Sequence, residues 1–184
     1  MPFTDVLPSH WFFGDVKWVY DNKYMEGVSA TLFAPNQAIT QATIVTVLAR
    51  LAEIDLSQFD GISYPGIAGG NWYTQPAIWA TQSGLLPDNS SFTGEEFLDR
   101  NGMAIMLVKY MRSLGLDTTP PQQRATFSDA DQMTQESNDA FQILYQYNIF
   151  RGVGGTAMDP ASSTTRAQFA ALVQRISDFA DTQK

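Results

Sequence analysis

Two arginines in this chain follow directly after residues that can cap a helix. Arg100 comes after Asp99 and Arg166 comes after Thr165, and each opens an apolar stretch with helical spacing. The N-terminus of a helix offers unpaired backbone N–H groups and a positive dipole end, and a guanidinium can hold a carboxylate through two parallel hydrogen bonds. This combination is suited to binding a carboxylate. The alternative is that both arginines are solvated or form structural ion pairs.

These arginines belong to a pattern that occurs three times, with a period of roughly 60 residues. In each copy an aromatic residue or Met precedes a capping residue by seven positions: Phe33 and Thr40, Phe92 and Asp99, Met158 and Thr165. Such a period indicates one supersecondary unit used three times. We place the repeats at residues 3–54, 64–115 and 127–179, because the segments between them are polar or rich in Gly and Pro.

Each repeat predicts two helices. The first should end near Gly27 in repeat one and Gly152 in repeat three, where Gly can adopt the left-handed conformation; repeat two has Asp88 there. The second should begin after Thr40, Asp99 or Thr165. Its apolar residues fall at matching helical offsets: Ile44, Val47, Leu48 and Leu51; Met103, Met106, Leu107 and Tyr110; Phe169, Leu172, Val173 and Ile176. Three such faces can meet around a pseudo-threefold axis, which predicts an all-α fold with a central bundle.

Composition excludes several classes of function. The chain has 184 residues, no cysteine and a formal net charge of −8, which argues against nucleic-acid binding. A single histidine, His10, excludes a metal site built on several imidazoles, and no nucleophile elbow or phosphate-binding loop occurs. No apolar run is long enough to span a membrane, and Met1-Pro2 leads directly into the first repeat without a signal-peptide pattern, as in a mature fragment. We therefore predict no catalytic residues, no cofactor and no metal site.

Several short phrases resemble the repeats of the S-layer homology (SLH) family. Residues 163–169, with Thr165-Arg166-Ala167 at their centre, and Ile39-Thr40-Gln41-Ala42 resemble the TRAE motif of that family. Phe3-Thr4-Asp5-Val6 followed by Trp11 is mirrored by Phe127-Ser128-Asp129, and Phe33-Ala34-Pro35 precedes the motif. Any one copy is a weak match, but three in register cover essentially the whole chain.

The resemblance implies a three-pronged pseudo-trimer of SLH repeats around a central three-helix bundle. It implies noncovalent anchoring of a surface protein to the bacterial cell envelope, outside the cell. Family members bind secondary cell-wall polymers attached to peptidoglycan, often through pyruvylated N-acetylmannosamine, in grooves between neighbouring repeats. The expected partners are therefore this polysaccharide and an attached surface cargo, with neither nucleic acid nor membrane insertion.

On this basis the candidate glycan-binding residues fall into four groups. Arg100, Arg166 and the matching Gln41 would meet a carboxylate; Thr40 and Thr165 cap the same helices; Trp11 and Trp72 would stack on sugar faces; Asp5, Asp129, Gly27 and Gly152 complete the set. Each has a structural alternative. Packing against the neighbouring helix is the favoured interpretation for the tryptophans, and a backbone requirement is favoured for the glycines. For the aspartates, a cap or turn and a sugar contact are equally open. The basic set Arg50, Lys109 and Arg175 is interpreted as structural, with groove lining as its alternative.

No single repeat carries the whole set. Gln41 replaces Arg in repeat one, Asp88 replaces Gly in repeat two, and Glu136 aligns with Trp11 and Trp72 in repeat three. We therefore expect unequal grooves. Two other functions stay open: a scaffold whose exposed aromatics contact a protein partner or a second copy of the chain, and, less favoured, a cell-wall glycosidase, for which no carboxylate pair stands out.

Overall fold

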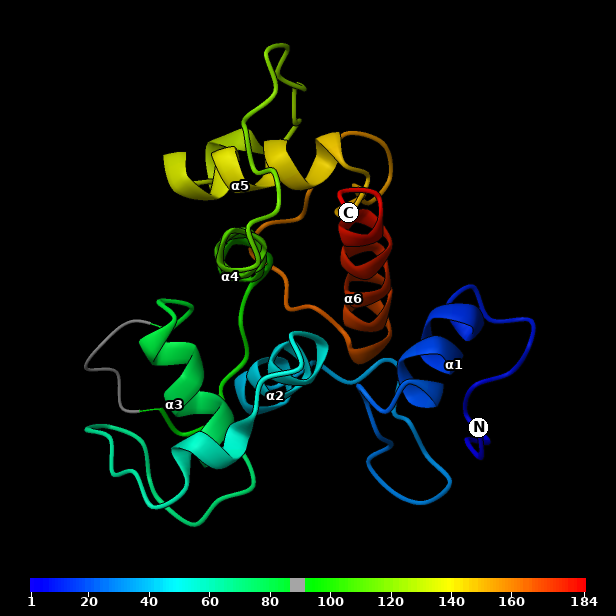
Figure 1. Ribbon diagram of the computed structural model, residues 1–184. Helices are drawn as coiled ribbons and strands as arrows, with labels where there is room; N and C mark the ends of the chain where they lie inside the picture. Colours follow the sequence, from blue (N-terminus) through cyan, green and yellow to red (C-terminus); the bar gives the residue numbers. More distant parts are fainter. Residues whose placement is uncertain (87–91) are drawn as a thin grey trace.

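The computed structural model describes residues 1–86 and 92–184, and this part of the chain is helical, without a strand or sheet (Figure 1). Its α-helices are α1 (Phe13–Asp21), α2 (Gln41–Leu51), α3 (Thr74–Gln82), α4 (Arg100–Ser113), α5 (Gln135–Gln146) and α6 (Arg166–Asp181). Two 3₁₀ turns, η1 (Leu56–Phe59) and η2 (Ala130–Gln132), lie in the connections. The all-α prediction is confirmed. None of the described helices is long and apolar enough to cross a membrane.

The second helices of the repeats begin where the sequence predicts. Thr40, Asp99 and Thr165 each accept a hydrogen bond from the backbone N–H three residues on. Thr165 also forms a full capping box with Gln168. The apolar positions of all three helices are buried except Leu51, which is partly buried. They belong to one continuous core.

The α-helices of the described residues pack in pairs that cross the repeat boundaries. Helices α2, α4 and α6 lie nearer the centre, and α1, α3 and α5 lie outside them (Figure 1). The closest pairs are α2 with α3, α4 with α5, and α1 with α6. Each outer helix therefore packs on the central helix of the preceding repeat, and the first helix closes the ring on the last.

The N-terminal end of each central helix is hydrogen-bonded to a loop of another repeat. Gln41 N–H donates to the Glu96 carbonyl at 2.8 Å, Arg100 N–H to Ser162 at 2.9 Å, and Arg166 N–H to Gln37 at 2.9 Å. The next residue of each helix makes a similar bond, to Gly94, Pro160 or Pro35. The expectation of unpaired first-turn N–H groups beside the arginines is therefore wrong, because loops of another repeat already accept from them.

The predicted role of the glycines in ending the first helices is also wrong. α1, α3 and α5 are followed by Lys23, Gly84 and Asn148, with φ of 62°, 71° and 56°, and these residues supply the left-handed turn. Gly27 and Gly152 lie four residues further on and do not have positive φ. Asp88 lies outside the described residues.

Candidate functional site

Arg166 is a buried link between the third repeat and the first. Its side chain is 7% exposed. Nε donates to the Phe33 carbonyl at 2.8 Å and Nη2 to the Glu26 carbonyl at 2.6 Å, while the guanidinium lies 4.7 Å from the centre of the Phe33 ring. Burial lowers the pKa of Arg166, and the nearby Asp5 carboxylate acts in the opposite direction.

Arg100 repeats this arrangement between the second and third repeats, with one difference. Its Nε donates to the Met158 carbonyl at 2.6 Å and its guanidinium lies 4.5 Å from the centre of the Phe150 ring. Burial lowers its pKa, opposed by Asp159 and Asp129. The side chain is 5% exposed, and among residues 1–86 and 92–184 no acceptor pairs with its buried Nη2. A buried donor without a partner is costly.

Asp5 and Asp129 brace the segments against which these arginines pack. The two carboxylate oxygens of Asp5 accept from the N–H groups of Phe33 and Ala34 at 2.9 and 2.8 Å. Those of Asp129 accept from Met158 and Asp159 at 3.1 and 2.7 Å. Both carboxylates thus hold turns of the backbone.

The first of two matching hollows, groove A, has a volume of about 410 Å³ and combines residues of all three repeats. Gly27 and Arg50 come from repeat one, Trp72 from repeat two and Arg166 from repeat three. The rest of its lining is Tyr24, Met25, Glu26, Val28, Thr43, Thr46 and Val47.

The second hollow, groove B, has a volume of about 220 Å³ and also combines a glycine, a tryptophan and arginines from the three repeats. Gly152 and Arg175 come from repeat three, Trp11 from repeat one and Arg100 from repeat two. Phe150, Arg151, Val153, Gln168, Ala171 and Leu172 complete the lining, and each stands 125 positions after a residue of groove A. The two grooves are therefore equivalent sites built at different repeat boundaries.

The tryptophans are largely exposed and not buried against a neighbouring helix, in contrast to the favoured interpretation. Trp11 is 65% exposed and Trp72 is 62% exposed. Both precede the first turn of their helices, so they are not on the buried helical face. Each makes an edge-on contact with the following aromatic ring, Phe12 or Tyr73. An exposed indole at the side of a groove is free to stack on a ligand.

The glycines of the grooves are required by close packing. A Cβ on Gly27 would lie 2.4 Å from Phe3 Cε1 and 2.5 Å from the Leu32 carbonyl oxygen, and one on Gly152 would lie 2.7 Å from the Ala157 carbonyl oxygen. Arg50 and Arg175 also have a structural contact, since their Nη1 atoms donate to the Tyr24 and Ile149 carbonyls at 3.1 and 3.0 Å. Both nevertheless line their grooves.

The remaining predicted residues do not line either groove. Thr40, Thr165 and Gln41 lie in the ring of loops and helix N-termini, and Asp5 and Asp129 lie behind the arginines. In grooves A and B the buried arginine comes from the repeat before the glycine, and the tryptophan comes from the repeat after it. By the same order, Gln41 and Glu136 belong to the third boundary. There Lys109 and Glu136 line a hollow of about 450 Å³. Sequence reasoning missed Glu26, Thr46, Arg151 and Gln168, although a register of 125 residues around Gly27 and Gly152 would have found them.

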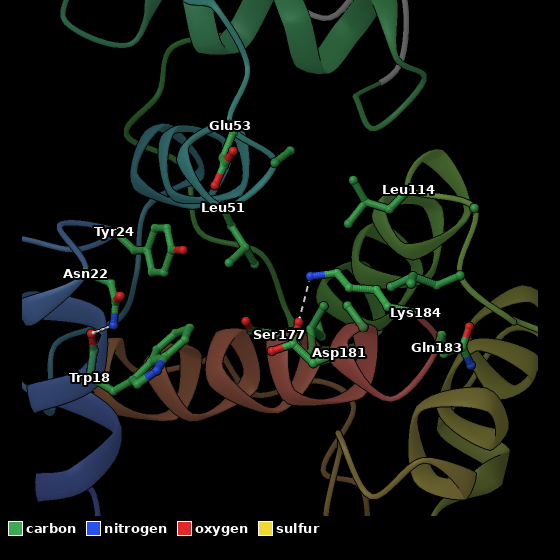
Figure 2. A pocket seen from close by; sticks show the side chains of 15 residues that line it. Trp18, Asn22, Tyr24, Leu51, Glu53, Leu114, Ser177, Asp181, Gln183 and Lys184 are labelled. Carbon is green, nitrogen blue, oxygen red and sulfur yellow. Dashed lines mark hydrogen bonds and ion pairs between the residues drawn. The ribbon is translucent and has the colours of Figure 1, made fainter.

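A hollow larger than grooves A and B contains none of the predicted residues. It has a volume of about 710 Å³ and lies where the C-terminal ends of the central helices approach one another. Figure 2 shows Trp18, Tyr24 and Leu51 around it, with Lys184 directed at Asp181. That ion pair, at 2.8 Å, joins two well-exposed side chains and contributes little stability.

Comparison with known proteins assigns two segments of this chain to a family. Residues 2–44 and 126–170 match the family model described as the S-layer homology domain, and both matches lie in the first and third repeats. The chain belongs to the S-layer homology family. The resemblance inferred from the TRAE-like phrases is thereby confirmed, and this SLH module is a cell-surface region that serves envelope anchoring.

Three relatives show the contexts in which similar SLH modules occur. An endoglucanase of Bacillus sp. (strain KSM-635) is 27% identical over 95% of this chain and 18% of its own length. The S-layer protein sap of Bacillus anthracis is 25% identical over 94% of this chain and 21% of its own length. An amylopullulanase of Thermoanaerobacterium thermosulfurigenes is 21% identical over 93% of this chain and 9% of its own length. The chain thus spans less than a quarter of each of these relatives.

Proposed function

We propose that this SLH module attaches a larger surface protein noncovalently to the envelope by binding a carboxylate-bearing secondary wall polymer in grooves A and B. A pyruvylated N-acetylmannosamine unit fits the chemistry, because its ketal presents a carboxylate on a sugar ring. The observation that carries the proposal is the repeated assembly of one exposed indole, one buried arginine, one glycine and a second arginine from three separate repeats.

Each member of this set has a role toward such a unit. Trp72 or Trp11 supplies a flat apolar face for the sugar ring. The carboxylate is drawn to the arginines, whose local positive charge opposes the net charge of −8 on the whole chain. In groove B a carboxylate oxygen would also give Arg100 Nη2 an acceptor, which no residue in 1–86 and 92–184 supplies. Gly27 and Gly152 line the grooves at positions where a Cβ would collide with neighbouring atoms of the protein.

Two similar sites on one rigid module suit a repeating polymer. A second groove that engages the same chain binds at high local concentration, which raises the overall affinity without new contacts. We further propose that the module itself is not an enzyme, since the endoglucanase and the amylopullulanase share it over only 18% and 9% of their lengths.

The test is co-sedimentation with purified cell-wall sacculi, before and after chemical removal of the secondary polymer. The variants are Trp11→Ala, Trp72→Ala and their combination, because both side chains are exposed and their loss should leave the fold intact. Phe97→Ala is the matched control, an aromatic that is 54% exposed and lines neither groove.

We expect the wild type and Phe97→Ala to sediment only with unstripped sacculi, single tryptophan variants to bind more weakly, and the double variant to stay in the supernatant. Binding that survives stripping, or a double variant that sediments like the wild type, would refute the proposal. Retention that depends on the tryptophans but needs a protein component of the wall would establish the scaffold function instead.

A further inference from the structure

Grooves A and B share one plan but differ in charge. Groove B is lined by Arg100, Arg151 and Arg175 and by no carboxylate. Groove A is lined by Arg166 and Arg50 and by the acidic Glu26, which stands at the position of Arg151. Both Glu26 and Arg151 are exposed. The two grooves therefore present different fields to an anionic polymer, although their aromatic and glycine positions match.

We propose that Arg151 and Arg175 form a second anion subsite in groove B, so that this groove takes a glycan unit with two anionic groups while groove A takes a unit with one. This inference rests on the proposed function of the grooves. The second group is a uronate carboxylate or a phosphate on the sugar next to the one beside Trp11.

The two arginines are positioned but not neutralised. Arg151 Nε donates to Asn148 Oδ1 at 2.8 Å, and Arg175 Nη1 donates to the Ile149 carbonyl at 3.0 Å. Each of these bonds goes to a neutral oxygen, and within residues 1–86 and 92–184 neither arginine forms an ion pair. The other N–H groups of each fork are left for a ligand.

The surroundings of the pair favour an added anion. Burial lowers the pKa of Arg175, and repulsion from Arg151 lowers it further. Asp15 on α1 faces both arginines and opposes this effect, but it is beyond ion-pair distance and burial raises its own pKa. Two like charges side by side, held by neutral acceptors, lose their mutual repulsion when an anion lies between them.

Groove A lacks this pair of arginines because one of the two positions holds an acidic residue. Arg50 is the counterpart of Arg175 and is held in the same way, by the Tyr24 carbonyl. Its neighbour is Glu26, whose backbone carbonyl accepts from Arg166 while its carboxylate remains exposed at the groove. A second anion there would meet a like charge, so groove A should discriminate against dianionic units.

The test is isothermal titration calorimetry with three synthetic disaccharides. All end in pyruvylated N-acetylmannosamine, and the next sugar is glucose, glucuronate or glucose with a methyl phosphodiester, which carries one negative charge as glucuronate does. We expect the two dianionic probes to bind one site about five- to tenfold more tightly than the glucose probe. A preference for only one of them identifies the second group as carboxylate or phosphate.

Three variants make the test specific. Arg151→Gln should abolish most of this preference, with a much smaller loss of affinity for the glucose probe than for the other two. Arg124→Gln, which removes the same charge from an exposed ion pair with Asp139, should retain the preference. Glu26→Arg should convert groove A, giving two tight sites for the dianionic probes in place of one.

The two proposals fail in different ways. If all three probes bind equally and Arg151→Gln changes nothing, the second subsite is refuted and the carboxylate grooves stand. If no probe binds at millimolar concentration, both proposals are overturned.

Discussion

Replacing Arg166 with alanine should destabilise the whole module as well as weaken its binding. The side chain bridges two repeats that lie far apart in sequence, with hydrogen bonds to Phe33 and Glu26 carbonyls 133 and 140 residues away. Its removal leaves both carbonyls without their donor and takes the guanidinium away from the Phe33 ring. A variant intended to remove a ligand contact would therefore also remove a structural link.

The expected loss can be built up from these contacts. A hydrogen bond from a charged donor contributes about 1.5–3 kcal/mol, and a desolvated cation–π contact about 2 kcal/mol. The desolvation cost of the buried charge disappears with it and offsets part of the sum. We expect a net loss of about 3–5 kcal/mol, a large share of the roughly 5–15 kcal/mol that stabilises a typical domain. The melting temperature should fall by about 10 °C.

The assay is urea denaturation followed by far-ultraviolet circular dichroism. Arg50→Ala is the matched control, because Arg50 is exposed and makes a single hydrogen bond, to the Tyr24 carbonyl at 3.1 Å. We expect it to cost about 1 kcal/mol or less. If Arg166→Ala and Arg50→Ala unfold at the same urea concentration, the structural role assigned to Arg166 is refuted, and any loss of wall retention reflects ligand contact alone.

Three further substitutions test the local geometry by the same denaturation assay. Gly27→Ala should destabilise the module by about 1–3 kcal/mol, because the new Cβ would collide with Phe3. Gly14→Ala is the control: it has open space around it and should stabilise the first helix by about 0.5–1 kcal/mol. Equal effects of the two substitutions would contradict the packing argument. Asp5→Asn should cost about 2 kcal/mol, because one amide oxygen cannot replace two carboxylate acceptors, and an unchanged midpoint would contradict this role. Tyr110→Phe should raise stability by about 1 kcal/mol, since it removes a buried hydroxyl that has no partner among the described residues; a clear loss would indicate a hydrogen bond to water.

The parts of the fold that local sequence determines were predictable. Helix starts at Thr40, Asp99 and Thr165 follow from capping chemistry, and the buried faces follow from helical periodicity. Periodicity does not identify the element against which a face packs, so the pairing of each outer helix with the preceding repeat was not accessible. The burial of Arg166 was hidden for the same reason, since its partners lie in the first repeat.

Glycine shows a second kind of limit. A glycine just after a predicted helix suggests a left-handed turn, yet Gly27 is needed because nothing larger fits beside Phe3. The left-handed residue is Lys23, which has no special preference for that conformation. A positive φ and a lack of space for a Cβ both favour glycine at a position. The sequence therefore shows glycine in either case, and only the surrounding atoms reveal which requirement applies.

The assembly of each groove from three repeats changes the meaning of the departures from the family pattern. Judged repeat by repeat, Gln41 and Glu136 impair repeats one and three, and neither repeat is complete. In the folded chain both departures belong to the same boundary, so grooves A and B keep their full sets. Removing repeat one would take Trp11 from groove B as well as Gly27 and Arg50 from groove A. Each groove draws on all three repeats, so the proposed function predicts that a segment of one or two repeats does not bind the wall polymer.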